Sequence, residues 1–210
     1  MKRIIFHWTA GAHKASAIDL EHYHEVIEGD GRVVFGKHPI SANKAPLSAK
    51  YAAHTLNANT DSIGIAVCAM AGAVQSPFKS GKYPITPLQV SQLAKEIARL
   101  AKGYNIPVTR QTILSHAEVQ PTLGIKQRGK WDIAWIPGWP SATDPIGVGD
   151  HIRKLVAEEL AGMSRPVEKP TPGPRPEPAA RPVPKPTPPV AANPLAGFFA
   201  WLSRVFGGKS

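Results

Sequence analysis

Two histidines of this sequence end short apolar runs that are typical of β-strands. His7 follows KRIIF near the start of the chain, and His116 follows RQTILS. Asp132 comes sixteen residues after His116, within GKWDIAW. Two imidazoles and one carboxylate would leave one coordination position open, which is the arrangement that a catalytic zinc uses to hold water or substrate. The spacing does not show that the three side chains converge, so ordinary surface histidines are an equal alternative.

The cysteine content argues against other roles for a metal or a thiol. A structural zinc usually has four protein ligands, mostly cysteines, and this chain has one cysteine. Cys68 lies inside the apolar run SIGIAVCAM, where we expect it to fill the core rather than to act as a nucleophile. A single cysteine also excludes an intramolecular disulfide.

Strand and helix signals alternate along residues 1–162. Two short strands are expected around the turn at 29–31, and a capping box of Thr86 and Gln89 predicts the start of a long helix. This alternation predicts a single α/β domain with a central mixed β-sheet flanked by helices. The other strands are expected within 2–8, 62–70 and 110–116, and the helices within 15–24, 86–107 and 147–162.

The composition changes after residue 162. Residues 163–192 are rich in proline and predict an extended linker that cannot pack a core. Residues 193–210 place apolar side chains at helical spacing among basic residues, so we expect a short, cationic amphipathic helix. Such a helix is too short to cross a bilayer but could lie on an anionic membrane or on lipopolysaccharide. Docking back onto the domain is the alternative.

The charge of the chain points to an anionic partner. The formal net charge is +10, which favours binding to nucleic acid, anionic lipid or bacterial cell wall. The basic residues of the domain are scattered, with neither a glycine-rich phosphate loop nor a basic and aromatic platform, so nucleic acid is not expected as a partner. The apolar run at the start breaks at His7 and Thr9, which predicts synthesis without a cleaved signal peptide.

Four stretches, in this order, carry a family resemblance. They are IIFHWTAG, YHEVIEGDGRVVFG, AAHTLNANTDSIGIAV and ILSHAEVQPTLGIKQRGKWDI. Together they resemble the zinc-dependent N-acetylmuramoyl-L-alanine amidases of the amidase-2 type, which include phage lysozymes and peptidoglycan recognition proteins. The resemblance runs from about Lys2 to Asp132 and implies that His7, His116 and Asp132 bind Zn²⁺.

The resemblance also implies roles for residues around the metal. Tyr23 and Lys130 occupy the positions that assist catalysis in the family, and His54 resembles a histidine of the substrate groove. The family often has proline directly after the third ligand, whereas Ile133 stands here. Lys126 is therefore a competitor of Lys130 for the catalytic role.

A cation and a hydrogen-bond donor beside the metal would stabilise the oxyanion of amide hydrolysis, and Lys130 and Tyr23 are the candidates. The proton donor to the leaving amine stays open among Tyr23, Lys130, Glu25 and Glu118. Five other histidines are expected to lie on the surface or to have their hydrogen bonds satisfied within the protein. Three tryptophans are expected either to line a substrate groove or to cover the sheet. These are His13, His22, His24, His38 and His151, and Trp131, Trp135 and Trp139.

The resemblance implies hydrolysis of the amide between N-acetylmuramic acid and L-alanine in bacterial peptidoglycan. We expect a monomeric phage or prophage endolysin, made in the host cytoplasm, that acts on periplasmic peptidoglycan after release. A cytoplasmic amidase that recycles anhydro-muropeptides and a non-catalytic peptidoglycan-binding module are the alternatives.

Overall fold

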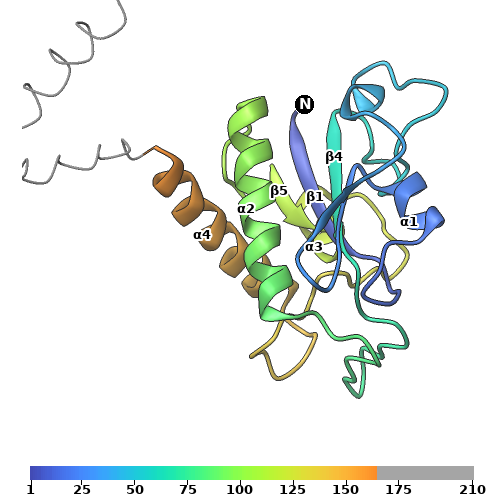
Figure 1. Ribbon diagram of the computed structural model, residues 1–210, viewed down its shortest axis with the longest axis vertical. Coiled ribbons are helices and arrows are strands. Elements are labelled where there is room, and N and C mark those ends of the chain that lie inside the picture. Colours follow the sequence, from blue (N-terminus) through green and yellow to red (C-terminus); the bar gives the residue numbers. More distant parts are fainter. Residues whose placement is uncertain (165–210) are drawn as a thin grey trace, which may run out of the picture. The chain divides into compact units, whose positions relative to one another are not determined.

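The fold is a five-stranded sheet with helices on both faces, seen in a computed structural model that describes residues 1–164 (Figure 1). The strand order is β3-β2-β4-β1-β5, with β2 and β3 antiparallel and the other neighbours parallel. The expected α/β domain with a mixed sheet is therefore confirmed. The strands are β1 (Arg3–Trp8), β2 (Glu25–Ile27), β3 (Val33–Phe35), β4 (Ser62–Val67) and β5 (Ile113–Ser115).

Four α-helices and one 3₁₀ helix accompany the sheet in the described part of the chain. Within it, no helix combines the length and the apolar character needed to cross a bilayer. The predicted linker, 163–192, lies outside the described residues except for its first two positions, and the predicted tail, 193–210, lies wholly outside them. The helices are α1 (Ala17–His22), η1 (Ile40–Asn43), α2 (Pro87–Tyr104), α3 (His116–Leu123) and α4 (Pro145–Met163).

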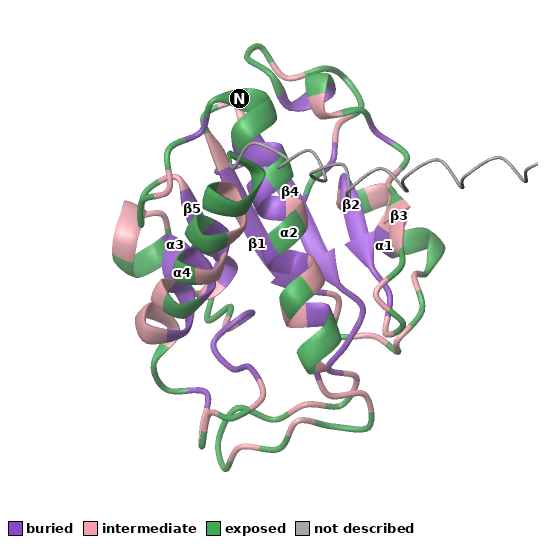
Figure 2. Cartoon of the chain, turned by 60° about the vertical axis from the view of Figure 1, so that its left-hand side comes forward, coloured by how far each residue is buried: buried purple, intermediate pink, exposed green. Residues whose placement is uncertain are grey.

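Helices α2 and α4 pack against each other over one face of the sheet (Figure 1). The alternation of β1 sends Ile4 and Phe6 into the large core beneath these helices. Ile5 points to the opposite face, where it packs with Leu114 of β5 and Val119 of α3. The central strands are buried on both faces (Figure 2). By the same alternation, His7 lies on the face of Ile5, away from α2.

Local caps determine the boundaries of the two long helices. The α2 capping box of Thr86 and Gln89 forms as expected, and the helix ends at Tyr104, within the expected range, because Asn105 adopts a left-handed conformation. Helix α4 begins at Pro145, before the expected start at 147, because Asp144 caps it.

Helix α3 was not predicted at all. Its sequence, HAEVQPTL, contains Pro121 and shows weak apolar periodicity. The prediction that His116 ends a strand is therefore wrong: β5 stops at Ser115, and His116 is the first residue of α3. The helix starts there because Glu118 accepts a hydrogen bond from the Ser115 backbone N–H, which is part of a capping box.

Candidate active site

His7, His116 and Asp132 converge on one point at the ends of β1 and β5. Oδ2 of Asp132 lies 3.0 Å from Nδ1 of His7 and 3.2 Å from Nδ1 of His116. One ligand atom from each residue lies within 4.8 Å of the others, and all three side chains are buried. Because β1 and β5 are parallel neighbours, their carboxyl ends bring the two histidines to the same sheet edge. The structure thus brings together the three residues predicted as metal ligands.

The electrostatics of this cluster suit a metal ion. Burial lowers the pKa of His7 to about 4, and the charges of His116 and Lys130 act in the same direction, although the hydrogen bond with Asp132 opposes them. Burial by itself would raise the pKa of Asp132, but hydrogen bonds with His116 and His7 hold it well below its usual range. At neutral pH the site therefore offers a neutral imidazole and a carboxylate, which are the protonation states that a metal ion requires. The donor set fits zinc.

A cavity of about 610 Å³ opens beside the cluster. His116 and Asp132 line it, as do three residues predicted from the family resemblance: Tyr23, His54 and Lys130. Lys126, the competitor of Lys130, is exposed and does not line the cavity. The location of the two lysines therefore favours Lys130 for a role in catalysis.

Tyr23 stands between α1 and β2, directly against the first histidine. Its ring centroid lies 5.1 Å from that of His7. Burial raises the pKa of Tyr23 well above its usual range, and the charge of Asp132 adds to this shift. The phenol therefore stays protonated at neutral pH and can donate a hydrogen bond into the cavity.

His54 contacts His7 as well as the cavity. Its Nδ1 lies 3.3 Å from Nε2 of His7 and 2.8 Å from Oγ1 of Thr55. The ring lies against the backbone of β4 at Gly64, where any Cβ atom would overlap it. Nε2 of His54 is buried and has no partner among the described residues. The glycine of the SIGIAV strand thus makes room for this histidine.

Both carboxylates considered as proton donors lie outside the cavity. Glu118 forms an ion pair with Arg153 of α4, with Nη2 and Oε1 2.8 Å apart. Glu25 pairs with Arg99 of α2. Neither glutamate lines the cavity, so Tyr23 and Lys130 are the candidates that remain.

The other histidines and the thiol behave as expected of structural residues. His24 is buried, but Nδ1 accepts a hydrogen bond from the Gly64 N–H and Nε2 lies 3.1 Å from Oδ1 of Asn43. Burial raises the pKa of the Cys68 thiol to about 12, which suits a core residue. His151 is exposed on α4. The remaining three, His13, His22 and His38, have hydrogen-bond partners at Pro84, Ala53 and Glu21.

The tryptophans divide between the two expected roles. Trp131 lines the cavity, and its ring meets that of Trp8 edge to face at 4.6 Å. Trp135 belongs to the core, where its Nε1–H donates to the carbonyl of Trp139. Trp131 is thus the tryptophan of this group that can contact a ligand in the cavity.

Sequence reasoning missed the residues that support the histidines from behind. Thr55 and Gln127 are both buried. Oγ1 of Thr55 lies within hydrogen-bond distance of Nε2 of His7, and Oε1 of Gln127 lies within hydrogen-bond distance of Nε2 of His116. Gln127 sits in a loop without periodicity, so no sequence signal marks it. Gly64 does carry a signal, because a glycine inside an apolar strand indicates close approach of another group.

A sheet edge that holds a buried His-His-Asp cluster beside an open cavity defines a candidate metal-dependent hydrolase. The family described as Amidase_2, N-acetylmuramoyl-L-alanine amidase, matches residues 1–138. The chain therefore belongs to this family, and the expected enzyme class is confirmed. A search of curated proteins found no match.

Several solved structures are similar to this chain. A mutant of PlyL has a TM-score of 0.44 at 16% identity, over 74% of this chain and 84% of that one. The hydrolase AmiA of Staphylococcus aureus, in complex with its ligand, has a TM-score of 0.49 at 14% identity, over 77% and 74%. The amidase AmiD of E. coli, in complex with the substrate anhydro-N-acetylmuramic acid-L-Ala-D-γ-Glu-L-Lys, has a TM-score of 0.40 at 20% identity, over 56% and 48%.

Proposed function

We propose that this chain hydrolyses the amide bond between N-acetylmuramic acid and L-alanine in peptidoglycan, with Zn²⁺ held by His7, His116 and Asp132. The observation that carries the proposal is the convergence of these three buried side chains beside an open cavity. Membership of the amidase family supports the choice of bond. A bound zinc ion would supply Lewis acidity, which makes water nucleophilic at neutral pH and polarises the scissile carbonyl.

The residues of the cavity wall have defined tasks in this reaction. The ammonium group of Lys130 stabilises negative charge on the carbonyl oxygen as the amide carbon becomes tetrahedral. The protonated phenol of Tyr23 donates a hydrogen bond to the same region. The nitrogen of L-alanine needs a proton as the C–N bond breaks, and both groups carry one. His54 and Trp131 line the cavity that the muramoyl peptide would occupy.

The metal-dependent reaction can be tested on purified sacculi. The full chain should release new L-alanine amino termini, chelation should stop the release, and added zinc should restore it. His116→Ala should abolish it, whereas His151→Ala is the matched control, because that histidine is exposed and lies outside the cavity. Sacculi that bind the protein but yield no amine would instead support a non-catalytic binding module.

We further propose that the enzyme is an endolysin of a phage or prophage, made as a monomer in the host cytoplasm and acting on periplasmic peptidoglycan. The cationic composition of residues 193–210, after a proline-rich stretch, supports a segment that meets an anionic envelope surface. Rates on intact sacculi and on soluble anhydro-muropeptides distinguish the roles. An endolysin should prefer sacculi, and a recycling amidase should prefer the soluble substrate.

Deletion of residues 167–210 tests the role of the C-terminal part. The core and the cavity lie within the compact unit 1–166, so the shortened chain should still cleave purified sacculi. It should lose activity against intact Gram-negative cells if the tail acts at the envelope. Equal activity of both chains on intact cells would contradict that role.

A further inference from the structure

We infer that Gln127 is a positioning residue that fixes the ring orientation and the tautomer of His116. The inference rests on the proposed role of His116 as a metal ligand. Gln127 belongs to the loop between α3 and Asp132, yet its side chain is buried. Its Oε1 lies 2.8 Å from Nε2 of His116, the ring nitrogen that faces away from Asp132.

The orientation of the Gln127 amide is determined by its other contacts. Its Nε2 group donates hydrogen bonds to the backbone carbonyls of Leu56, at 3.0 Å, and Ile125, at 3.3 Å. A flipped amide would place Oε1 against two carbonyl oxygens, which cannot donate a hydrogen bond. The carbonyl oxygen of the side chain must therefore face His116.

This orientation determines which nitrogen of His116 carries a proton. Oε1 of Gln127 can only accept, so Nε2 of His116 must donate. The lone pair of Nδ1 would then be available to a metal ion, although in the zinc-free chain the Asp132 carboxylate, with Oδ2 at 3.2 Å from Nδ1, competes for the same proton. Two acceptors at this distance are stabilised by a cation beside both of them. Gln127 thus selects the tautomer that presents Nδ1 for coordination.

The loop of residues 54–56 supports both histidines. His54 and Thr55 face Nε2 of His7 at 3.3 and 3.4 Å, while the carbonyl of Leu56 holds Gln127 behind His116. In both His7 and His116, Nε2 contacts these supporting residues and Nδ1 points toward Asp132. Residues 54–56 therefore help to orient both histidine rings of the site.

Gln127 is tested by one substitution and a control. Gln127→Met keeps the volume of the side chain but removes the acceptor, and it should weaken zinc affinity about 10- to 100-fold. Gln92→Met removes an amide from α2, where it contacts Glu96, and should leave zinc affinity unchanged. Affinity is measured by competition with a chromophoric chelator, which requires no turnover.

The tautomer itself gives a second readout. In zinc-loaded protein, long-range ¹⁵N NMR correlations should show a metal-bound Nδ1 and a protonated Nε2 for His116 in the wild type, and the Nε2 proton should exchange faster with water in Gln127→Met. Wild-type zinc affinity in Gln127→Met, or coordination of the metal through Nε2 of His116 in the wild type, would overturn the inference. If Gln127→Met fails to fold, the nitrogen of His116 that binds the metal in the wild type decides: coordination through Nδ1 supports the inference, and coordination through Nε2 overturns it.

This design separates the inference from the proposed function. If the wild-type chain binds no zinc, the metal-dependent reaction fails as a proposal, while crystal structures of the zinc-free wild type and Gln127→Met still decide whether Gln127 fixes the orientation of the His116 ring. If zinc binds and the tautomer is as expected but sacculi are not cleaved, the assignment of Gln127 stands and the amidase reaction does not.

Discussion

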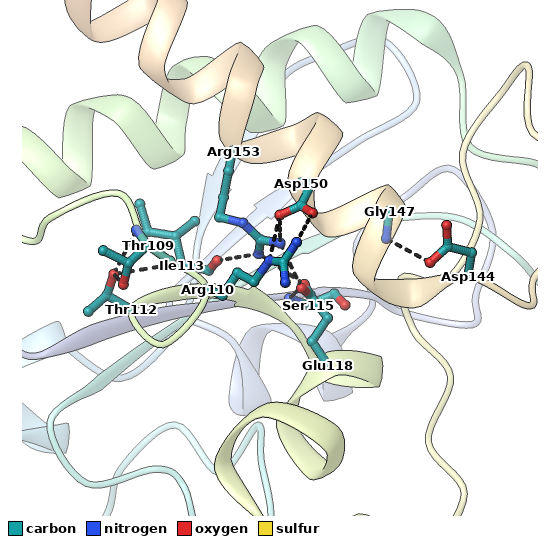
Figure 3. A network of polar contacts seen from close by, with 10 residues as sticks. All are labelled: Thr109, Arg110, Thr112, Ile113, Ser115, Glu118, Asp144, Gly147, Asp150 and Arg153. Atoms are coloured by element: carbon teal, nitrogen blue, oxygen red, sulfur yellow. Dashed lines mark hydrogen bonds and ion pairs between the residues drawn. The ribbon is translucent and has the colours of Figure 1, made fainter.

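Arg153→Met should be among the most destabilising single substitutions in the domain. Arg153 of α4 forms a buried ion pair with Glu118 of α3 (Figure 3). The Glu118 side chain is fully buried, and its other polar contact is the backbone N–H of Ser115 at 2.8 Å. Burial raises the pKa of Glu118, although the ion pair with Arg153 opposes this shift.

The expected magnitude follows from what the substitution leaves behind. Methionine can fill the space of the arginine stem, but the Glu118 carboxylate loses its cation and the carbonyl of Ile113 loses a donor at 2.8 Å. Removing one partner of a buried ion pair typically costs about 3–5 kcal/mol of unfolding free energy. For a chain of this size that corresponds to a decrease in Tm of roughly 6–20 °C.

The assay is thermal and urea unfolding of zinc-free protein. Arg110→Met is the matched control, because Arg110 pairs with Asp150 in the same cluster but both side chains are largely exposed, at 55% and 42% (Figure 3). Its loss should cost at most about 1 kcal/mol. The double variant Arg153→Met/Glu118→Gln should recover part of the stability, because no charge is then buried. Equal effects of Arg153→Met and Arg110→Met would refute the reasoning.

Three further predictions concern catalysis, packing and pH. Lys130→Ala should slow turnover about 100- to 1000-fold with zinc still bound, whereas Lys126→Ala should leave the rate unchanged; equal rates for both variants would contradict the assignment. Gly64→Ala should displace the His54 ring and cost about 1–3 kcal/mol in urea unfolding, and a crystal structure with His54 unmoved would disagree. Burial lowers the pKa of His24 from 6.5 to about 4, so as the pH falls the unfolded chain is protonated at this histidine before the folded chain is. The free energy of unfolding should therefore be unaffected by His24 above pH 6.5 and should fall by about 3 kcal/mol as the pH approaches 4. NMR titration of the His24 ring measures this pKa, and a value near 6.5 would argue against the mechanism.

The elements that carry strong local signals could be predicted from the sequence. The capping box of Thr86 and Gln89 and the apolar face of α2 depend on neighbouring residues, so local pattern was sufficient. The two histidines were found because each follows an apolar run that must stop at the sheet edge. Their convergence with Asp132 required the parallel pairing of β1 and β5, which the spacing alone does not show.

The residues that were missed depend on contacts distant in sequence. Helix α3 forms although it contains Pro121, because its capping box and the packing of Val119 stabilise it. Glu118 is satisfied by an arginine thirty-five residues away, so the sequence left it open as a proton donor. Gln127 acquires its role from Leu56, which comes from a different loop. No local pattern records such pairings.

The most direct test of the account is hydrolysis of a defined muramoyl peptide in ¹⁸O-labelled water, with the products analysed by mass spectrometry. The proposed reaction predicts one ¹⁸O atom in the lactyl carboxyl group of N-acetylmuramic acid and an unlabelled peptide with a free L-alanine amino terminus. The His116→Ala variant should give neither product. Label in a peptide carboxyl group or at the reducing end of the glycan would contradict the account, because the bond cleaved would then not be the muramoyl amide.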